Sequence, residues 1–285
     1  PAKARNTPIG GANYALHVDA LLVAKYLRKY SEERGLKRTE GKVVEVGRRA
    51  DGFVESVTLA DGRKIAGDFF IDCTGFKALL IGKTLAVDSV DWSDYLPCDR
   101  AVVCKTENKG NLAPYTRATA QAAGWSWRIP LQRRVGNGYV YSSRFATDDT
   151  PRATLLRVID AACVDEPRII PYTTGHRREF WRHNVLSLGL SSGFIEPLEA
   201  TSIHLIARGM DLFLRYFPDK DCESALIREY NRRMIADFEE VRDFIVLHYS
   251  ATQRDDTPFW QWCRNIPLPD SLRERIGVFT SASQM

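Results

Sequence analysis

A strand, a glycine-bearing loop and a helix are predicted in succession over residues 184–217, and this segment restricts the fold more than any other. NVLSLGLSS (184–192) has the apolar character of a buried strand. TSIHLIARGMDLFLRYF (201–217) has helical periodicity. Its predicted apolar face consists of Ile203, Ile206, Met210 and Phe213. Unpaired backbone N–H groups and the helix dipole at the start of this helix favour an anion beside the loop.

The loop in this segment carries two glutamates, Glu196 and Glu199, on either side of Pro-Leu. Their neighbours are apolar or small, and carboxylates are seldom left there unless they are paired, cap a helix or take part in chemistry. One interpretation is structural: Glu199 and Thr201 cap the helix, and Glu196 is a loop acid. In the other interpretation, the loop binds a ligand and its acids take part in chemistry. The residues alone leave both interpretations open.

The first third of the chain predicts a helix, a β-meander and a buried strand. The helix covers 19–34, with Asp19 as its N-cap, and strands follow at 42–46 and 53–59. DFFIDCTGF (68–76) predicts a buried strand that ends in a Cys-Thr-Gly turn. This order is found in FAD-binding oxidoreductases, where glycine lets the backbone approach the cofactor, but it also fits a strand with an ordinary turn.

GWSWRIPL (124–131) alternates strictly and predicts a strand. Trp125, Trp127 and Ile129 share one face, and Pro130 ends the run. The Asn137-Gly138 pair that follows is typical of a hairpin turn.

Composition excludes several classes of function. The 285 residues carry a net charge of +4 with no block of lysine and arginine, so nucleic acid is not the expected partner. No apolar run is long enough to cross a membrane. The six scattered cysteines favour reduced thiols over a disulfide frame, and no metal site is predicted. These cysteines are Cys73, Cys98, Cys104, Cys163, Cys222 and Cys263.

Three motifs together resemble the flavin-dependent tryptophan halogenase family: FIDCTGF (70–76), GWSWRIP (124–130) and GFIEPLEATSIHLI (193–206). ALHVDALLVAKYL (15–27) and HYSATQRDDTPFW (248–260) are also similar to it. In the family, the W-x-W-x-I-P motif separates halogenases from related flavin hydroxylases. The resemblance implies an α/β fold of the FAD-binding, glutathione-reductase-like (p-hydroxybenzoate hydroxylase-like) type, with a mixed β-sheet and a helical substrate region.

The resemblance also implies a reaction. Reduced FAD (FADH2), O2 and chloride or bromide give hypohalous acid, which halogenates tryptophan or another indole-like aromatic. A separate flavin reductase is the expected partner because FAD must arrive reduced, and a cytoplasmic location follows. Homodimer formation, the ring position and the halide preference are left open.

Residue roles are carried over from the family where positions match. Glu199 lies by the substrate, in a dry and partly apolar pocket that would raise its basicity. The backbone N–H groups of Thr201 and Ser202 hold the halide, and Ser202 can do so if its φ is negative. The predicted flavin contacts are Leu190, Ile203 and, near the adenine, Val43. The predicted tunnel wall consists of Trp125, Trp127, Ile129 and Pro130. By contrast, Glu196 is expected to be structural and His204 to have no catalytic role.

Four segments are expected: 1–99 with the meander and the Cys-Thr-Gly turn, 100–183 with the paired tryptophans, 184–217 with the halide and flavin loop, and 218–285, which is helical. The family's GxGxxG fingerprint and catalytic lysine have no counterpart here, so the sequence is interpreted as the interior of a longer chain. Two alternatives remain. One is an FAD-dependent aromatic hydroxylase, and the other is an inactive module, kept open by Ala200 and Ser202 where the family carries Ser and Gly.

Overall fold

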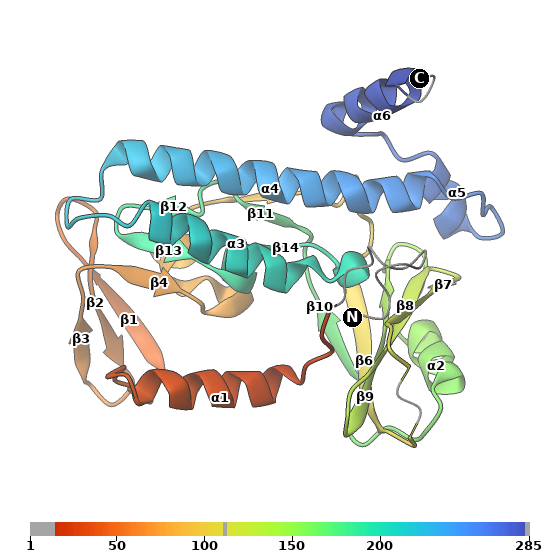
Figure 1. Ribbon diagram of the computed structural model, residues 1–285, viewed down its shortest axis with the longest axis horizontal. Coiled ribbons are helices and arrows are strands. Elements are labelled where there is room, and N and C mark those ends of the chain that lie inside the picture. Colours follow the sequence, from red (N-terminus) through yellow and green to blue (C-terminus); the bar gives the residue numbers. More distant parts are fainter. Residues whose placement is uncertain (1–14, 111–112, 283–285) are drawn as a thin grey trace, which may run out of the picture.

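The computed structural model describes residues 15–110 and 113–282. The long helix α4 (Ser224–Ser250) runs along one side of the molecule, and α1 (Ala20–Glu32) runs along the opposite side (Figure 1). Small sheets lie between them. The first fourteen residues of the expected 1–99 segment lie outside the described residues.

The predicted helix, meander and following strand are confirmed, but the predicted burial of that strand is wrong in part, because Ile71 is exposed and Phe70 only partly buried. Asp19 caps α1 by accepting a hydrogen bond from the Leu21 N–H, and it also pairs with Arg134. Because no residue of α1 is buried, core packing contributes little to this helix, and the contacts of Asp19 help to hold it in place. The antiparallel meander follows, and its strands are β1 (Val43–Arg48), β2 (Val54–Leu59) and β3 (Lys64–Ala66).

The strand that ends in the Cys-Thr-Gly turn, β4 (Phe70–Asp72), pairs in parallel with β13 (Val185–Ser187). The outer strand of this sheet is β12 (Trp181–Arg182). The parallel pairing brings the turn after β4 next to the loop after β13, which continues into the short helix η4 (Gly189–Ser191). Two segments more than one hundred residues apart in the sequence thus meet at one sheet edge.

Asp72 fixes the turn between β4 and the following helices η2 (Gly75–Lys77) and η3 (Leu79–Thr84). Its carboxylate is fully buried and accepts hydrogen bonds from the N–H and the hydroxyl of Thr74. The second oxygen accepts from the N–H groups of Leu80 and Ile81, at 2.9 Å each. One side chain therefore satisfies the backbone donors of the turn and of the next helix.

A five-stranded antiparallel sheet forms the far end of the molecule (Figure 1). Its strands in spatial order are β10 (Arg168–Pro171), β6 (Arg100–Glu107), β9 (Arg134–Tyr141), β8 (Gly124–Pro130) and β7 (Arg117–Gln121), and α2 (Asp149–Val158) packs against it. The hairpin turn predicted at Asn137-Gly138 is wrong, because both residues lie inside β9. Glycine is needed at 138 because a Cβ atom there would lie 2.1 Å from the Trp127 ring.

A disulfide joins Cys104 on β6 to Cys163, fifty-nine residues further along the chain. The expectation of reduced thiols is therefore wrong for this pair, since sequence spacing does not reveal that β6 and the segment after α2 lie side by side. The remaining four cysteines are free.

The helical half packs over a fourth sheet, formed by β5 (Ser89–Asp91), β11 (Gly175–Arg177) and β14 (Gly193–Phe194). The helices are α3 (Thr201–Arg215), α4, α5 (Pro258–Arg264) and α6 (Asp270–Ala282), with the short helix η5 (Pro197–Glu199) before α3. The predicted apolar face of α3 is wrong in part. Ile203 and Ile206 are exposed, and the buried stripe is instead Leu205, Gly209, Leu212 and Phe213.

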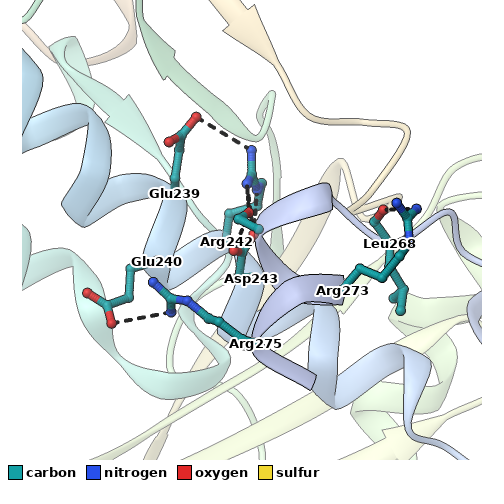
Figure 2. A network of polar contacts seen from close by, with 8 residues as sticks. Glu239, Glu240, Arg242, Asp243, Leu268, Arg273 and Arg275 are labelled. Atoms are coloured by element: carbon teal, nitrogen blue, oxygen red, sulfur yellow. Dashed lines mark hydrogen bonds and ion pairs between the residues drawn. The ribbon is translucent and has the colours of Figure 1, made fainter. Parts of the chain in front are cut away.

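A buried polar network ties α6 to α4 (Figure 2). Arg242 donates to Asp243 at 2.8 Å, and the Ser271 hydroxyl on α6 donates to the other oxygen of Asp243 at 2.6 Å. Arg275 on α6 pairs with Glu240 on α4 at 3.3 Å. None of the helices described is long and apolar enough to cross a membrane.

Replacing Asp72 by alanine should destabilise the protein by about 3 kcal/mol, because buried N–H groups lose their acceptor. Urea denaturation would measure the loss. The control Asp68→Ala removes a carboxylate that is 75% exposed and pairs with Lys220. Its effect should stay within about 0.5 kcal/mol. Equal effects of the two substitutions would contradict the assigned role of Asp72.

Candidate functional site

The two glutamates of the loop lie on either side of η5, between β14 and α3. Glu196 precedes η5 and Glu199 ends it. Ala200 then has φ +54° and ψ +34°, a left-handed conformation that turns the chain into α3 without a side-chain cap. The predicted capping of α3 by Glu199 and Thr201 is therefore wrong, because no side chain caps this helix. The two glutamates form their contacts elsewhere.

Glu199 faces His248 near the end of α4, with its Oε1 3.0 Å from the imidazole Nε2. The Glu199 side chain is 40% exposed. His248 Nδ1 lies 2.7 Å from the carbonyl oxygen of Phe244. Both ring nitrogens thus face acceptors, so one proton must lie between Nε2 and the carboxyl group to satisfy the arrangement. The structure thus places a partly exposed acid–imidazole pair beside the start of α3.

Glu196 has the opposite environment, since it is fully buried. Its Oε1 accepts hydrogen bonds from the Trp125 indole Nε1 at 2.9 Å and from the Tyr249 hydroxyl at 2.5 Å. Burial raises the pKa of Glu196 to about 7, although the hydrogen bonds from Tyr249 and Trp125 oppose the shift. The dry pocket predicted for Glu199 is therefore found at Glu196.

Adjacent residues of α4 hold the two acids: His248 contacts Glu199, and Tyr249 contacts Glu196. Sequence reasoning missed both partners. No spacing rule links a helix in the 218–285 segment to a loop some fifty residues earlier. Among the described residues, no group of three or more His, Cys, Asp or Glu side chains could hold a metal ion.

Thr201 and Ser202, the predicted halide residues, occupy the first turn of α3. Their N–H groups have no partner within the helix by position, which leaves them available to an anion. Ser202 has a negative φ, so the condition placed on it is met. Ser202 and Leu190 line the same cavity of about 190 Å³, beside Ile206. The structure thus brings a predicted halide residue and a predicted flavin contact together.

A larger cavity of about 570 Å³ lies next to it. Its wall includes Phe76 after the Cys-Thr-Gly turn, together with Leu190 and Phe194. Gly75 has φ +69° and open space where a side chain would project, so the backbone is accessible there. Asp91, His176 and Arg177 also line this cavity, so its wall is partly apolar and partly polar. The apolar residues and the accessible backbone fit the flat ring of a flavin.

The other two predicted flavin contacts lie outside these cavities. Ile203 on α3 is 68% exposed, and Val43 is partly buried at the start of β1 in the meander sheet. His204 is exposed on α3, as expected of a histidine without a catalytic role.

The paired tryptophans share one face of β8, as predicted, with their ring centroids 5.8 Å apart. Trp125 is buried, while Trp127 and Ile129 are partly buried. Pro130 ends β8 and is also buried. The tryptophan face of β8 thus forms a wall. The hydrogen bond from Trp125 to Glu196 connects this wall to the loop before η5.

Glu196 makes the stability of the fold depend on pH. Folding raises its pKa from 4.5 to about 7, so the folded state binds the proton more tightly than the unfolded chain. The resulting stability is complete below pH 4.5 and is lost as the pH rises through about 7. The difference corresponds to about 3 kcal/mol of unfolding free energy.

In Glu196→Gln, which cannot ionise, urea denaturation should show that this loss between acid and neutral pH has disappeared. The control Glu240→Gln, at an exposed carboxylate, should keep the wild-type pH dependence. A Glu196→Gln variant with wild-type pH dependence would show that another group is responsible.

The chain matches the family profile for tryptophan halogenases over residues 1–285. Tryptophan 7-halogenase RebH from Lentzea aerocolonigenes is 38% identical over 272 residues, which cover 94% of this chain and 51% of RebH. Tryptophan 6-halogenase SttH from Streptomyces toxytricini is 38% identical over 268 residues, covering 92% and 51%. The chain therefore spans about half the length of the curated relatives it matches.

Solved structures are similar over nearly the whole chain. Xcc4156, a flavin-dependent halogenase from Xanthomonas campestris, gives a TM-score of 0.92 at 47% identity, covering 96% of this chain and 55% of that one. BrvH, a flavin-dependent halogenase from Brevundimonas sp. BAL3, gives 0.91 at 45% identity, covering 93% and 55%. These similarities confirm the predicted FAD-binding α/β fold class, and this chain belongs to the tryptophan halogenase family.

Proposed function

We propose that this chain is part of a flavin-dependent halogenase that uses reduced FAD, O2 and chloride or bromide to halogenate tryptophan or another indole-like aromatic. The observation that carries the proposal is the 3.0 Å contact between Glu199 and His248, a partly exposed pair beside the start of α3. RebH and SttH are described as tryptophan 7- and 6-halogenases, which supports an indole substrate.

The chemistry requires a base for one step. An aromatic ring that accepts an electrophilic halogen loses a ring proton, and a positioned carboxylate accelerates such a transfer. Glu199 would take this proton, and His248 would hold the carboxylate in place and stabilise its charge. The buried Glu196 is already saturated at Oε1 by two donors, so it is poorly placed for this role.

The first turn of α3 would hold the halide, with the N–H groups of Thr201 and Ser202 as donors. Leu190 and Phe76 would line the flavin ring. Ile203 and, near the adenine, Val43 would be further contacts outside this cavity. When bound, reduced FAD supplies the electrons for O2 and so the oxidising power that acts on the halide. Trp125 and Trp127 would wall off this region and keep the oxidised halogen from water.

A flavin reductase that diffuses separately is part of the proposal, because the flavin must be reduced before each turnover. So is a cytoplasmic location, where such a reductase would be available.

In the complete enzyme, Glu199→Gln should lower kcat for bromination of tryptophan or indole by about 10²- to 10⁴-fold, because the ring proton loses its acceptor. His248→Gln should cause a smaller loss, since Glu199 remains. Flavin binding, followed by flavin fluorescence, should be unchanged in both variants.

The control Glu240→Gln lies on α4 away from the site and should retain full activity. Product analysis by mass spectrometry decides between activities. Hydroxylated and no brominated product would exclude halogenation, and an active Glu199→Gln variant would favour a structural role for this acid.

A further inference from the structure

Glu196 joins elements that are far apart in the sequence. Through Oε1 it accepts from Trp125 on β8 and from Tyr249 on α4, while its own backbone belongs to the loop before η5. Tyr249 also contacts the Cys98 thiol at 3.5 Å. Within the residues that the structure describes, the second carboxyl oxygen, Oε2, is buried without a hydrogen-bond partner, as is the Tyr172 hydroxyl.

This asymmetry indicates where a proton would reside. Oε1 is occupied as an acceptor by two donors, whereas Oε2 is unpaired, so Oε2 is the atom that can carry a proton. When Glu196 is neutral, Oε1 is an ordinary carbonyl-like acceptor. When Glu196 is ionised, the same contacts become charge-assisted, and such hydrogen bonds are roughly twice as strong.

We propose that Glu196 is a positioning residue that orients Trp125, and with it the paired-tryptophan wall, relative to the loop that carries Glu199, through a hydrogen bond whose strength follows the protonation of Glu196. The effect on turnover rests on the proposed function. The hydrogen bond and its response to pH do not. The proposal separates the two acids of the loop: Glu199 would act on the substrate, and Glu196 would hold the wall behind it.

Every titratable group that faces Glu196 must be considered for this pH response. They are Cys98 before β6, Tyr172 after β10, His248 and Tyr249 on α4, and Cys263 on α5. Burial raises the pKa of both thiols and both phenols, so these four stay neutral near pH 7. Glu196 is the member of this set whose raised pKa brings its ionisation to about 7. A contribution from His248 can be separated from it by substitution.

The indole N–H of Trp125 reports directly on the contact. In ¹⁵N-labelled complete enzyme, Trp125→Phe would assign the Trp125 indole resonance. We expect that resonance to move downfield as the pH rises through about 7. In Glu196→Gln, which keeps an oxygen acceptor but cannot ionise, it should be present and independent of pH.

Trp127 is the matched control, since its indole N–H has no hydrogen bond among the described residues; its resonance should move much less. A Trp125 resonance that does not move with pH would overturn the proposal. So would one that moves equally in Glu196→Gln, because the response would then come from a group other than Glu196. These outcomes do not depend on halogenation, so a failed activity assay alone would count only against the proposed function.

Kinetics test the positioning role. Glu196→Leu and Trp125→Phe should each lower kcat at least about tenfold, since small misplacements in a reactive site are costly. The double variant should be within about twofold of the worse single variant, because both changes remove the same contact. Glu196→Gln should retain most of the activity. Multiplying losses in the double variant, or a Gln variant as impaired as the Leu variant, would contradict the role.

Discussion

The parallel pairing of β4 with β13 is the constraint on which the site depends. It brings the Cys-Thr-Gly turn and the loop of Leu190 to one sheet edge, although more than one hundred residues separate them. The main-chain carbonyl of Asp72 accepts from the Leu188 N–H and the Ser191 hydroxyl, while its side chain holds the turn. One residue therefore joins both loops. Ligands of open α/β sheets bind at the carboxyl ends of such strands, and both cavities lie there.

Two acids three positions apart have been given opposite environments by the same fold. Glu196 is sealed from solvent and bound by donors, whereas Glu199 is partly exposed and faces a histidine. Pairs of titratable groups whose surroundings differ in this way commonly divide acid–base and supporting roles. Here the difference in surroundings arises because η5 lies between the two acids, so that the Glu196 side chain is buried and the Glu199 side chain is partly exposed.

The sequence predicted the local elements well and the long-range contacts poorly. The meander, the strand β4, the tryptophan face and the start of α3 follow from periodicity and turn residues, which act within a few positions. The Cys104–Cys163 bond and the Glu199–His248 contact depend on which distant segments meet, and no local pattern encodes that. At Asn137-Gly138 a local pattern predicted a turn where the structure has a strand. The glycine is there because the Trp127 ring fills the space that a side chain at 138 would need.

Helix α4 has a mechanical consequence for the site. In its first third, the Asn231 side chain forms hydrogen bonds with the backbone of Phe180 and Trp181, and these anchor that part of the helix to the sheet. His248 and Tyr249 lie about 26 Å further along the axis, so a tilt of two degrees about the anchor displaces both by about 1 Å. The partners of the two acids would then move together. Substitutions around Asn231 can therefore alter the geometry at Glu199 from a distance, without touching any residue that meets a ligand.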